Sequence, residues 1–494
     1  MFHLACRYTP IASLALVTAL AGCGGNGYNH GYMAPNPMPT VMFTAPAQAS
    51  SIHFGEGLTL NWTTSNASSC TASASASAAG AFSGSQMTMG PMKIVPTAPG
   101  SYAYTLTCTG AGGMASATTA MVTVTQSVLS ALAAGQIQKI GTTVDPTNMD
   151  ANPYGLAVAP VTAGLITQGD LIVCNFNDAA GTQGNGTTIV GLHAAAGSQP
   201  YRIAQSAQLQ GCDALTLLSD DSISAAAWNA AKNPLVSPAG VVSTPISSAA
   251  ISQPWGEAYV PATATQPAAL YLSNAAAKAS TLQGNGSIDR IALNGDTPTS
   301  VVEIATGFCT VGFPSAIYAP SGLTYDASID TLYIIDTASD SVVAIANVSS
   351  VGADGVVVNG QCSAATAPPT AAPTFSGPSA ASARVVAHGA PLSAPLSAAL
   401  LADGDLIVGN ADIGVTATGP TVNLMIEVSP VLAGGFVGQP FQADNGMPGA
   451  LFGIATAADA QGNQIIYFND DNANAVMQMG SASGGVMPPG YALP

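Results

Sequence analysis

Two short acidic segments are the densest groups of metal-ligating side chains in the sequence. Asp220 and Asp221 are adjacent, and Asp470 and Asp471 lie between two asparagines. Hard cations such as Ca2+ bind about six to eight oxygen ligands, which carboxylates and amides can supply. Neither segment has the D-x-D-x-D-G spacing of an EF-hand loop, so solvated acidic turns are the alternative. We expect no cofactor, and binding of Ca2+ or another divalent cation by these four residues is the alternative.

The histidines beyond the N-terminal segment form no recognisable catalytic or metal motif. They are His30, His53, His193 and His388, and none has another histidine four residues away. Metal binding or general-base catalysis would require the fold to bring such residues together. The sequence also has no Gly-x-Ser-x-Gly elbow, no Walker loop and no Rossmann fingerprint. Motifs therefore identify no catalytic residue.

Six strand-like hydrophobic runs end in an amide or acidic residue, 45 to 74 residues apart. These strand-end residues are Asn175, Asn229, Asn274, Asp336, Asn410 and Asn469. Such side chains commonly end a strand by hydrogen bonding to the backbone of the following turn. We therefore expect a structural role for them, with a ring around a ligand-binding mouth as the alternative.

The chain has eight cysteines, of which Cys6 and Cys23 belong to the N-terminal segment. An even number of remaining cysteines in an exported protein indicates disulfides. Six cysteines allow fifteen connectivities. Their order in the sequence favours the pairs Cys70–Cys108, Cys174–Cys212 and Cys309–Cys362. Because no CxxC spacing occurs, thiol redox chemistry, c-type haem and a zinc knuckle have no support.

The N-terminus has the features of a bacterial export signal: Arg7 precedes an apolar run, Ile11 to Leu20, and small residues follow. The run is too short to remain in a bilayer as a spanning helix. The sequence Leu-Ala-Gly-Cys that ends at Cys23 resembles the lipobox of bacterial lipoproteins. This resemblance implies that residues 1–22 are a signal peptide and that Cys23 carries lipid. Gly24, in place of the Asp that favours inner-membrane retention in that family, implies the outer membrane or cell surface.

Charge is scarce and mostly negative: charged residues make up 7% of the chain, and the net charge is -17. Binding to nucleic acid requires clustered Lys and Arg to neutralise phosphates. The eight basic residues are not clustered, so nucleic acid is excluded as a partner. Anionic lipid head groups are poor partners for the same reason. We expect contact with a membrane through the lipid anchor alone.

The first folded domain is expected over residues 50–126, after a Gly/Pro-rich spacer over residues 23–49. Apolar and polar residues alternate around Trp62 and again around Tyr104, which is the period of a strand with one buried face. The segment resembles bacterial immunoglobulin-like domains through Asn-Trp-Thr-Thr at Trp62 and the two cysteines. A disulfide between Cys70 and Cys108 is expected to join the two sheets of this sandwich.

A repeat occupies residues 145–482. In most units the hydrophobic run that ends in Asn or Asp follows another strand, which begins Pro-x-Gly in three of them, and a third strand follows. Three strands and a variable fourth, repeated six times, indicate a β-propeller. The pattern resembles the NHL-repeat family of propellers. We expect six blades, with five or seven as alternatives.

Residues outside the repeat complete the expected organisation. Residues 127–144 are a linker, and Gln136 to Val144 could supply the outer strand that closes the ring and protects an exposed edge. Residues 350–392, rich in Ala, Pro and Ser, are expected to project from the disc. Residues 483–494 form a tail. The whole chain is therefore predicted to be all-β.

The composition and organisation favour a binding or scaffolding protein of the cell envelope, without catalysis, whose propeller contacts protein or glycan. Trp228 and Trp255 are expected to pack between blades, with stacking on sugar rings as the alternative. The second hypothesis is a divalent-cation-dependent hydrolase or lyase, because six-bladed lactonases resemble this layout. The early glutamate of that family is missing, and the nearest candidate is Glu257 in the third unit.

Overall fold

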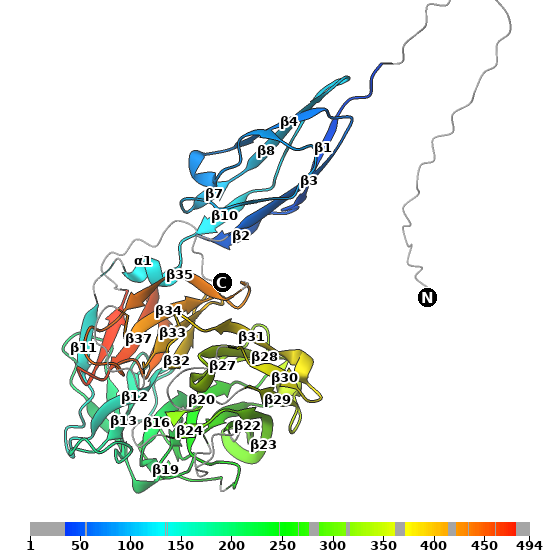
Figure 1. Cartoon of the computed structure of the whole chain (residues 1–494). Coiled ribbons are helices and arrows are strands. Elements are labelled where there is room, and N and C mark those ends of the chain that lie inside the picture. Colours follow the sequence, from blue (N-terminus) through cyan, green and yellow to red (C-terminus); the bar gives the residue numbers. More distant parts are fainter. Residues whose placement is uncertain are drawn as a thin grey trace, which may run out of the picture.

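The structure is a computed structural model, and it confirms the all-β prediction (Figure 1). It describes residues 35–54, 57–133, 135, 137–246, 248–264, 266–275, 286–312, 317–360, 371–412, 421–432, 434–459 and 461–480. Cys23 and the segments assigned to the signal peptide and the C-terminal tail lie outside these residues. Within the described part, no helix is both long and apolar enough to cross a membrane.

The N-terminal domain contains three small sheets around one core. The first is β1 (Thr40–Ala45), β3 (Leu58–Ser65) and β6 (Met92–Ile94). The second is β5 (Gly84–Gln86), β4 (Ser69–Ala74), β8 (Tyr104–Gly110) and β9 (Gly113–Thr118), and the third is β2 (Ser50–His53), β10 (Val122–Thr125) and β7 (Gly100–Tyr102). The 3-10 helix η1 covers Ser77–Ala79. Trp62 packs edge-on against Phe82, and both are buried.

The disulfide Cys70–Cys108 is present, but the expectation that it joins two sheets is wrong. Cys70 on β4 is the direct antiparallel partner of Cys108 on β8, so both cysteines belong to one sheet. Alternation of buried residues predicts which face of a strand is inward, but not which strands are neighbours. The bridge therefore reinforces one strand pair.

The propeller consists of six sheets, which we number as blades one to six along the chain (Figure 1). Blade one is β12 (Ala151–Val158), β13 (Leu171–Asn177), β14 (Thr188–Leu192) and β15 (Tyr201–Gln205). Blade two is β16 (Cys212–Leu217), β17 (Ile223–Ala227), β18 (Leu235–Val236) and β19 (Val242–Ser243). Blade three begins with β20 (Pro254–Val260), β21 (Ala269–Asn274), β22 (Gly286–Asn294) and β23 (Thr297–Phe308).

The remaining blades follow the same order from inner to outer strand. Blade four is β26 (Pro320–Asp326), β27 (Thr331–Asp336), β28 (Ser341–Ala346) and β31 (Ala383–His388). Blade five is β32 (Pro395–Leu400), β33 (Leu406–Asn410), β34 (Leu424–Val428) and β35 (Phe436–Gln442). Blade six is β36 (Ile454–Ala458), β37 (Gln464–Asp470), β38 (Ala475–Met479) and β11 (Gln138–Thr142). Smaller elements are β24 (Val311–Gly312), β25 (Ile317–Tyr318), η2 (Ala207–Leu209), η3 (Thr337–Ser339), η4 (Val348–Ser350) and η5 (Ala380–Ser382).

The inner strands contact one another in the closed order β12, β16, β20, β26, β32, β36 and back to β12. The outer strand of blade six, β11, comes from the start of the propeller and pairs with β38 near its end. The N-terminal and C-terminal ends of the ring are therefore joined in one sheet, which removes an exposed strand edge. A propeller follows from this topology.

The described part of the insertion 350–392 does not project from the disc. β29 (Val356–Asn359) pairs in parallel with β23, and β30 (Thr374–Ser376) pairs with β29, so blade three gains two outer strands. The end of the insertion forms β31, the outer strand of blade four. Val356 and Val358 are buried, and burial of these side chains against blade three explains why the segment lies along the disc.

The glycine of the Pro-x-Gly motif has a packing function. A Cβ atom at Gly256 would collide with the backbone carbonyl of Ser321 in the next inner strand. The same holds at Gly322 against Leu396 and at Gly453 against Tyr154. At these glycines neighbouring inner strands therefore approach too closely for a side chain, whereas blades two and five have Ala214 and Ser397 at the equivalent position.

Candidate functional site

An axial cavity of about 350 Å³ lies between the inner strands of all six blades. Alanine and glycine form much of its wall, including Ala157, Ala214, Ala398 and Ala455. Short side chains leave the axis open, whereas larger ones would fill it at normal packing density. Hydroxyl groups come from Thr216, Thr324, Thr456 and other residues of the wall.

Aromatic side chains pack together at the end of the axis where the inner strands begin. Five inner strands and the segment just before β36 each place one residue here, and we call these six the end ring: Tyr154, Asp213, Trp255, Ser321, Leu396 and Phe452. Tyr154 stacks on Phe452 and on Phe176, with ring centroids 4.0 and 4.3 Å apart. Four of the six belong to one hydrophobic cluster, which also contains Trp228. Trp228 and Trp255 thus pack between blades.

Asp213 is the acidic member of the end ring. Its side chain lines the cavity and is only 3% exposed, and neither carboxylate oxygen has a hydrogen-bond partner in the described structure. Burial raises the pKa of Asp213 well above its ordinary value, with a smaller contribution from Glu257 and against the opposing effect of the nearby Asp213 and Ala214 N–H groups, which lie outside normal hydrogen-bond geometry. An unsatisfied buried polar group is uncommon in native proteins and requires an explanation.

Asp213 belongs to no recognisable functional motif of the sequence. The available signal was the irregularity of the repeat in blade two, where Cys212-Asp213-Ala214 stands in place of Pro-x-Gly. A carboxylate at the position that holds Tyr154, Trp255 or Phe452 in other blades could have been found by aligning the units.

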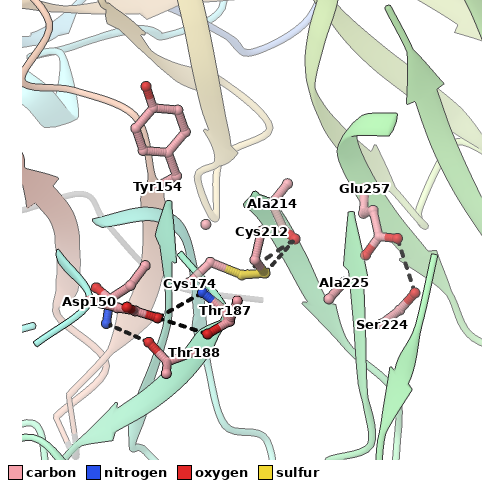
Figure 2. The surroundings of a disulfide bond; sticks show 12 residues. Asp150, Tyr154, Cys174, Thr187, Thr188, Cys212, Ala214, Ser224, Ala225 and Glu257 are labelled. Atoms are coloured by element: carbon pink, nitrogen blue, oxygen red, sulfur yellow. Dashed lines mark hydrogen bonds between the residues drawn. A yellow bond between two sulfur atoms is a disulfide. The ribbon is translucent and has the colours of Figure 1, made fainter. Parts of the chain in front are cut away.

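Glu257 is the second carboxyl group of the cavity wall, and it comes from β20. Its Oε1 accepts hydrogen bonds from the Ser224 hydroxyl at 3.0 Å and from the Asn233 amide (Figure 2 shows the Ser224 contact), while Oε2 has no partner in the described structure. Burial raises the pKa of Glu257 to about 8, against the opposing effect of these hydrogen bonds. Glu257 is therefore mostly protonated at neutral pH.

The cavity is suited to neutral or cationic groups. The described residues that line it include no Lys, Arg or His. An anion would therefore lose its hydration without gaining a counter-ion. A protonated carboxyl group, such as that of Glu257, both donates and accepts hydrogen bonds, as the hydroxyl groups of the wall do. This combination matches ligands rich in hydroxyl or amine groups.

The cavity does not match the ligand set of a hard divalent cation. Such an ion requires about six to eight oxygens. The end ring offers one carboxylate, Asp213, because the Ser321 hydroxyl already bonds Ile335 O at 3.1 Å and Thr337 Oγ1 at 2.7 Å. The other four members are aromatic or apolar.

The four acidic residues proposed from the sequence lie in two different turns. Asp220 and Asp221 connect β16 to β17 in blade two, whereas Asp470 and Asp471 lie at the end of β37 in blade six. Asp220 accepts hydrogen bonds from Ser222, Asp221 from Val161 N, and Asp470 from Ala473 N. None belongs to the group of three metal-ligating side chains found in the described residues, which is Asp403, Asp405 and Glu427.

The strand-end residues bind neighbouring segments of the chain. Asn469 Nδ2 donates to Tyr154 O at 2.7 Å, and Asn175 Nδ2 donates to Thr143 O at 2.9 Å. Asn410 donates to Pro391 O, and Asn229, which is exposed, donates to Gly184 O. Asn274 bonds Asp289 and the Ser252 N–H, and Asp336 accepts from the Ser339 hydroxyl at 2.5 Å. These contacts agree with the structural interpretation.

The two histidines whose side chains the structure describes, His193 and His388, lie in different blades and are not brought together. His193 Nδ1 lies 2.6 Å from Asp170 Oδ1 in blade one, and Tyr201 donates to the other oxygen of Asp170. His388 Nδ1 lies 3.1 Å from Ser341 Oγ in blade four. His30 lies outside the described residues.

One disulfide bond of the described residues joins two neighbouring blades. Cys174 on β13 of blade one is bonded to Cys212 on β16 of blade two, which confirms that pair (Figure 2). Because Asp213 follows Cys212, the bridge fixes the backbone next to the unpaired carboxyl group. Cys309 is also disulfide-bonded, and Cys362 lies outside the described residues.

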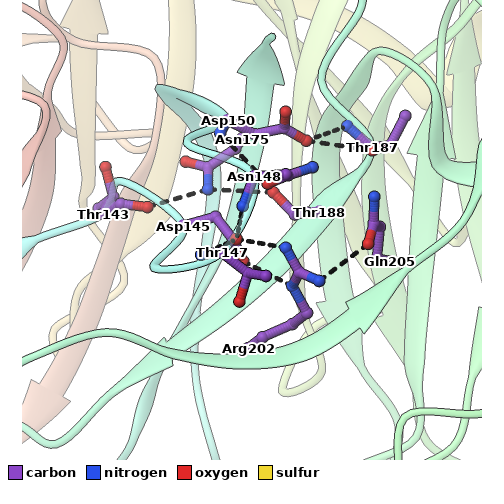
Figure 3. A network of polar contacts seen from close by, with 10 residues as sticks. All are labelled: Thr143, Asp145, Thr147, Asn148, Asp150, Asn175, Thr187, Thr188, Arg202 and Gln205. Atoms are coloured by element: carbon purple, nitrogen blue, oxygen red, sulfur yellow. Dashed lines mark hydrogen bonds and ion pairs between the residues drawn. The ribbon is translucent and has the colours of Figure 1, made fainter. Parts of the chain in front are cut away.

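A polar network fixes the segment between β11 and β12 (Figure 3). Asp145 is fully buried and pairs with the Arg202 guanidinium of β15, with Nε at 2.8 Å from Oδ2. Asp145 Oδ1 also accepts the N–H groups of Thr147 and Asn148. Burial opposes the charged form, but these hydrogen bonds hold the pKa of Asp145 below its ordinary value.

Comparison with known proteins gives fold-level similarity only. No protein-family model matches the sequence, and no curated protein matches it. Virginiamycin B lyase from Staphylococcus aureus is 14% identical over 70% of this chain and 99% of its own, with a TM-score of 0.39. A gluconolactonase from Xanthomonas campestris is 12% identical over 67% of this chain and 86% of its own, with a TM-score of 0.42. At such values the propeller assignment rests on the sheet topology above.

Proposed function

We propose that this chain is a binding protein of the cell envelope, held by lipid at Cys23 and carrying its ligand site in the propeller axis. The observation that carries the proposal is the axial cavity of about 350 Å³, which is lined by hydroxyl groups and by two carboxyl groups but by no described cationic residue. We infer a neutral or amine-bearing saccharide as the ligand class, which makes a glycan the partner.

Binding without catalysis agrees with the state of the two carboxyl groups. Catalysis by a carboxyl pair requires oxygens that reach the substrate. Both oxygens of Asp213 are enclosed by protein, and Glu257 is held by Ser224 and Asn233. The rest of the wall includes hydroxyl groups and small side chains, which recognise a ligand by shape and hydrogen bonding.

The test is binding of purified full-length protein to an array of neutral and amino saccharides. Ala398→Phe places a large side chain on the cavity wall, whereas Ala179→Phe adds the same side chain at an exposed position of blade one. We expect the wild type and A179F to bind the same saccharides and A398F to bind them at least tenfold more weakly. Absence of binding by the wild type, or equal binding by A398F, would contradict the proposal.

The alternative, a divalent-cation-dependent hydrolase or lyase, is favoured only by the unpartnered oxygens of Asp213 and Glu257. If a cation were held there, Asp213→Asn should reduce the metal content of the purified protein and remove any effect of chelator on its melting temperature. Metal content that is unchanged in D213N would remove this alternative.

A further inference from the structure

Three carboxyl groups converge at one place in blade five. Asp403 and Asp405 lie in the turn between β32 and β33, and Glu427 lies on β34. One oxygen from each lies within 4.8 Å of the other two. Asp403 is exposed, whereas Asp405 and Glu427 are buried. The cluster therefore has a buried floor and an open side.

This cluster lies where the N-terminal domain joins the propeller. The last strand of that domain ends at Thr125, and α1 (Val128–Ala133) begins three residues later. Val128 and Leu129 are buried in a hydrophobic cluster with residues of blades five and six. Their N–H groups donate to Oε1 and Oε2 of Glu427 at 3.1 and 2.6 Å. Glu427 therefore links the carboxyl cluster to the connecting helix.

The Ser429 hydroxyl is a further polar group directed to the same face of blade five. Ser429 is fully buried, and its hydroxyl has no hydrogen-bond partner in the described part of the chain. Its N–H donates to Gly435 O, so the extended ladder of β34 continues through it. Side chains two residues apart on a strand share a face, so Ser429 lies on the side of Glu427.

Strand register places Asp405 on this face as well. Ile407 pairs with Glu427 and Leu406 pairs with Val428, so Asp405 comes next to Ser429 along the antiparallel ladder. Residues opposite each other in such a ladder project to the same side. The three clustered carboxyl groups and one unpartnered buried hydroxyl thus belong to the same face of blade five.

We propose that Asp403, Asp405, Glu427 and Ser429 bind a hard divalent cation, with Ca2+ as the preferred ion, and that the bound ion braces α1 against the propeller. Ca2+ binds oxygen ligands at about 2.3–2.6 Å, so two ligands of one ion are separated by at most about 5 Å. The observed limit of 4.8 Å satisfies this condition. The exposed side at Asp403 leaves room for water ligands.

The test is a titration of chelator-treated full-length protein with CaCl2, followed by its melting temperature and by calorimetry. An ion that binds only the folded protein stabilises it by mass action. We expect one ion per chain and a rise of a few degrees that saturates by about 10 mM, because extracellular Ca2+ sites commonly have dissociation constants of about 0.1–1 mM. Asp403→Asn should remove the rise, and Ser429→Ala should weaken the affinity.

The matched control is Asp354→Asn, which removes an exposed carboxylate far from the cluster in sequence. It should respond to Ca2+ as the wild type does. An unresponsive wild type, or a D403N variant that responds as the wild type does, would overturn the site. Bracing is measured by protease cleavage within residues 126–137, which Ca2+ should slow in the wild type and not in D403N. Unchanged cleavage would overturn the bracing role.

Discussion

At the scale of single residues, Asp213 and Ser321 show how one position of the end ring can be occupied in opposite ways. Ser321 uses its hydroxyl twice, with Ile335 and Thr337, whereas the Asp213 carboxyl group has no partner in the described structure. Burial of a polar group without a hydrogen bond costs about 1–3 kcal/mol in proteins. The free energy of unfolding is therefore lowered by burying the Asp213 carboxyl group in a ring whose other members are mostly apolar.

Asp213→Leu is therefore expected to stabilise the protein. Leucine is present at the equivalent position of blade five, as Leu396, so the end ring accommodates this side chain. We expect the free energy of unfolding at pH 7 to rise by about 1–3 kcal/mol, measured by urea denaturation. Ser321→Leu, the same change in a bonded member of the ring, should lower it. A D213L variant less stable than the wild type would show that the carboxyl group has a stabilising partner.

Glu257→Gln should change how stability depends on pH. An unfolded glutamate releases its proton near 4.5, whereas burial raises the pKa of Glu257 in the folded protein to about 8. Between these values the folded state binds more protons than the unfolded state, so its stability falls as pH rises. A glutamine side chain at this position would keep an oxygen acceptor for Ser224 and Asn233 without titrating. The melting temperature of E257Q minus that of the wild type should increase from pH 5 to pH 8, and a constant difference would refute the assignment.

At the scale of elements, the glycine of Pro-x-Gly decides how closely the blades pack. Gly256→Ala is expected to destabilise the protein by about 1–3 kcal/mol, because its methyl group would overlap the Ser321 carbonyl and force two inner strands apart. Gly352→Ala is the control, since a Cβ atom there meets no atom within 4 Å. Thermal melts of the two variants should differ by several degrees. Equal melting temperatures would mean that the inner strands adjust without cost.

The same elements show what the sequence could predict. The inner-strand glycine recurs because four of the blades repeat the same close packing, and the strand-end residues recur in all six units, so the propeller could be predicted from them. The pairing of β4 with β8 could not be predicted from the sequence, and neither could the pairing of Val356–Asn359 with blade three. Alternation of apolar and polar residues shows which face of a strand is buried, but not which strand is its neighbour. The candidate site was missed at Asp213 because its environment depends on side chains from blades far apart in sequence, such as Tyr154 and Glu257.

At the scale of the whole molecule, the propeller is closed by the segment that enters it. β11 completes blade six, and the chain then passes through Asp145 before starting blade one at β12. The Asp145–Arg202 pair connects this segment to the outer strand of blade one. The ion pair therefore stabilises the joint between the first and last blades.

Arg202→Met should weaken this joint by leaving the fully buried Asp145 carboxylate without its cation. Loss of one partner of a buried ion pair costs about 3–5 kcal/mol, and because Arg202 is partly exposed we expect the lower part of that range. Arg384→Met removes an exposed guanidinium from β31 and should change the free energy of unfolding by less than about 0.5 kcal/mol. Hydrogen exchange should show faster opening of β11 and β38 in R202M than in R384M, because opening the ring begins at the strand pair that closes it. If the hydrogen-exchange protection of β11 and β38 is the same in R202M and R384M, the Asp145–Arg202 ion pair does not stabilise the closure of the ring.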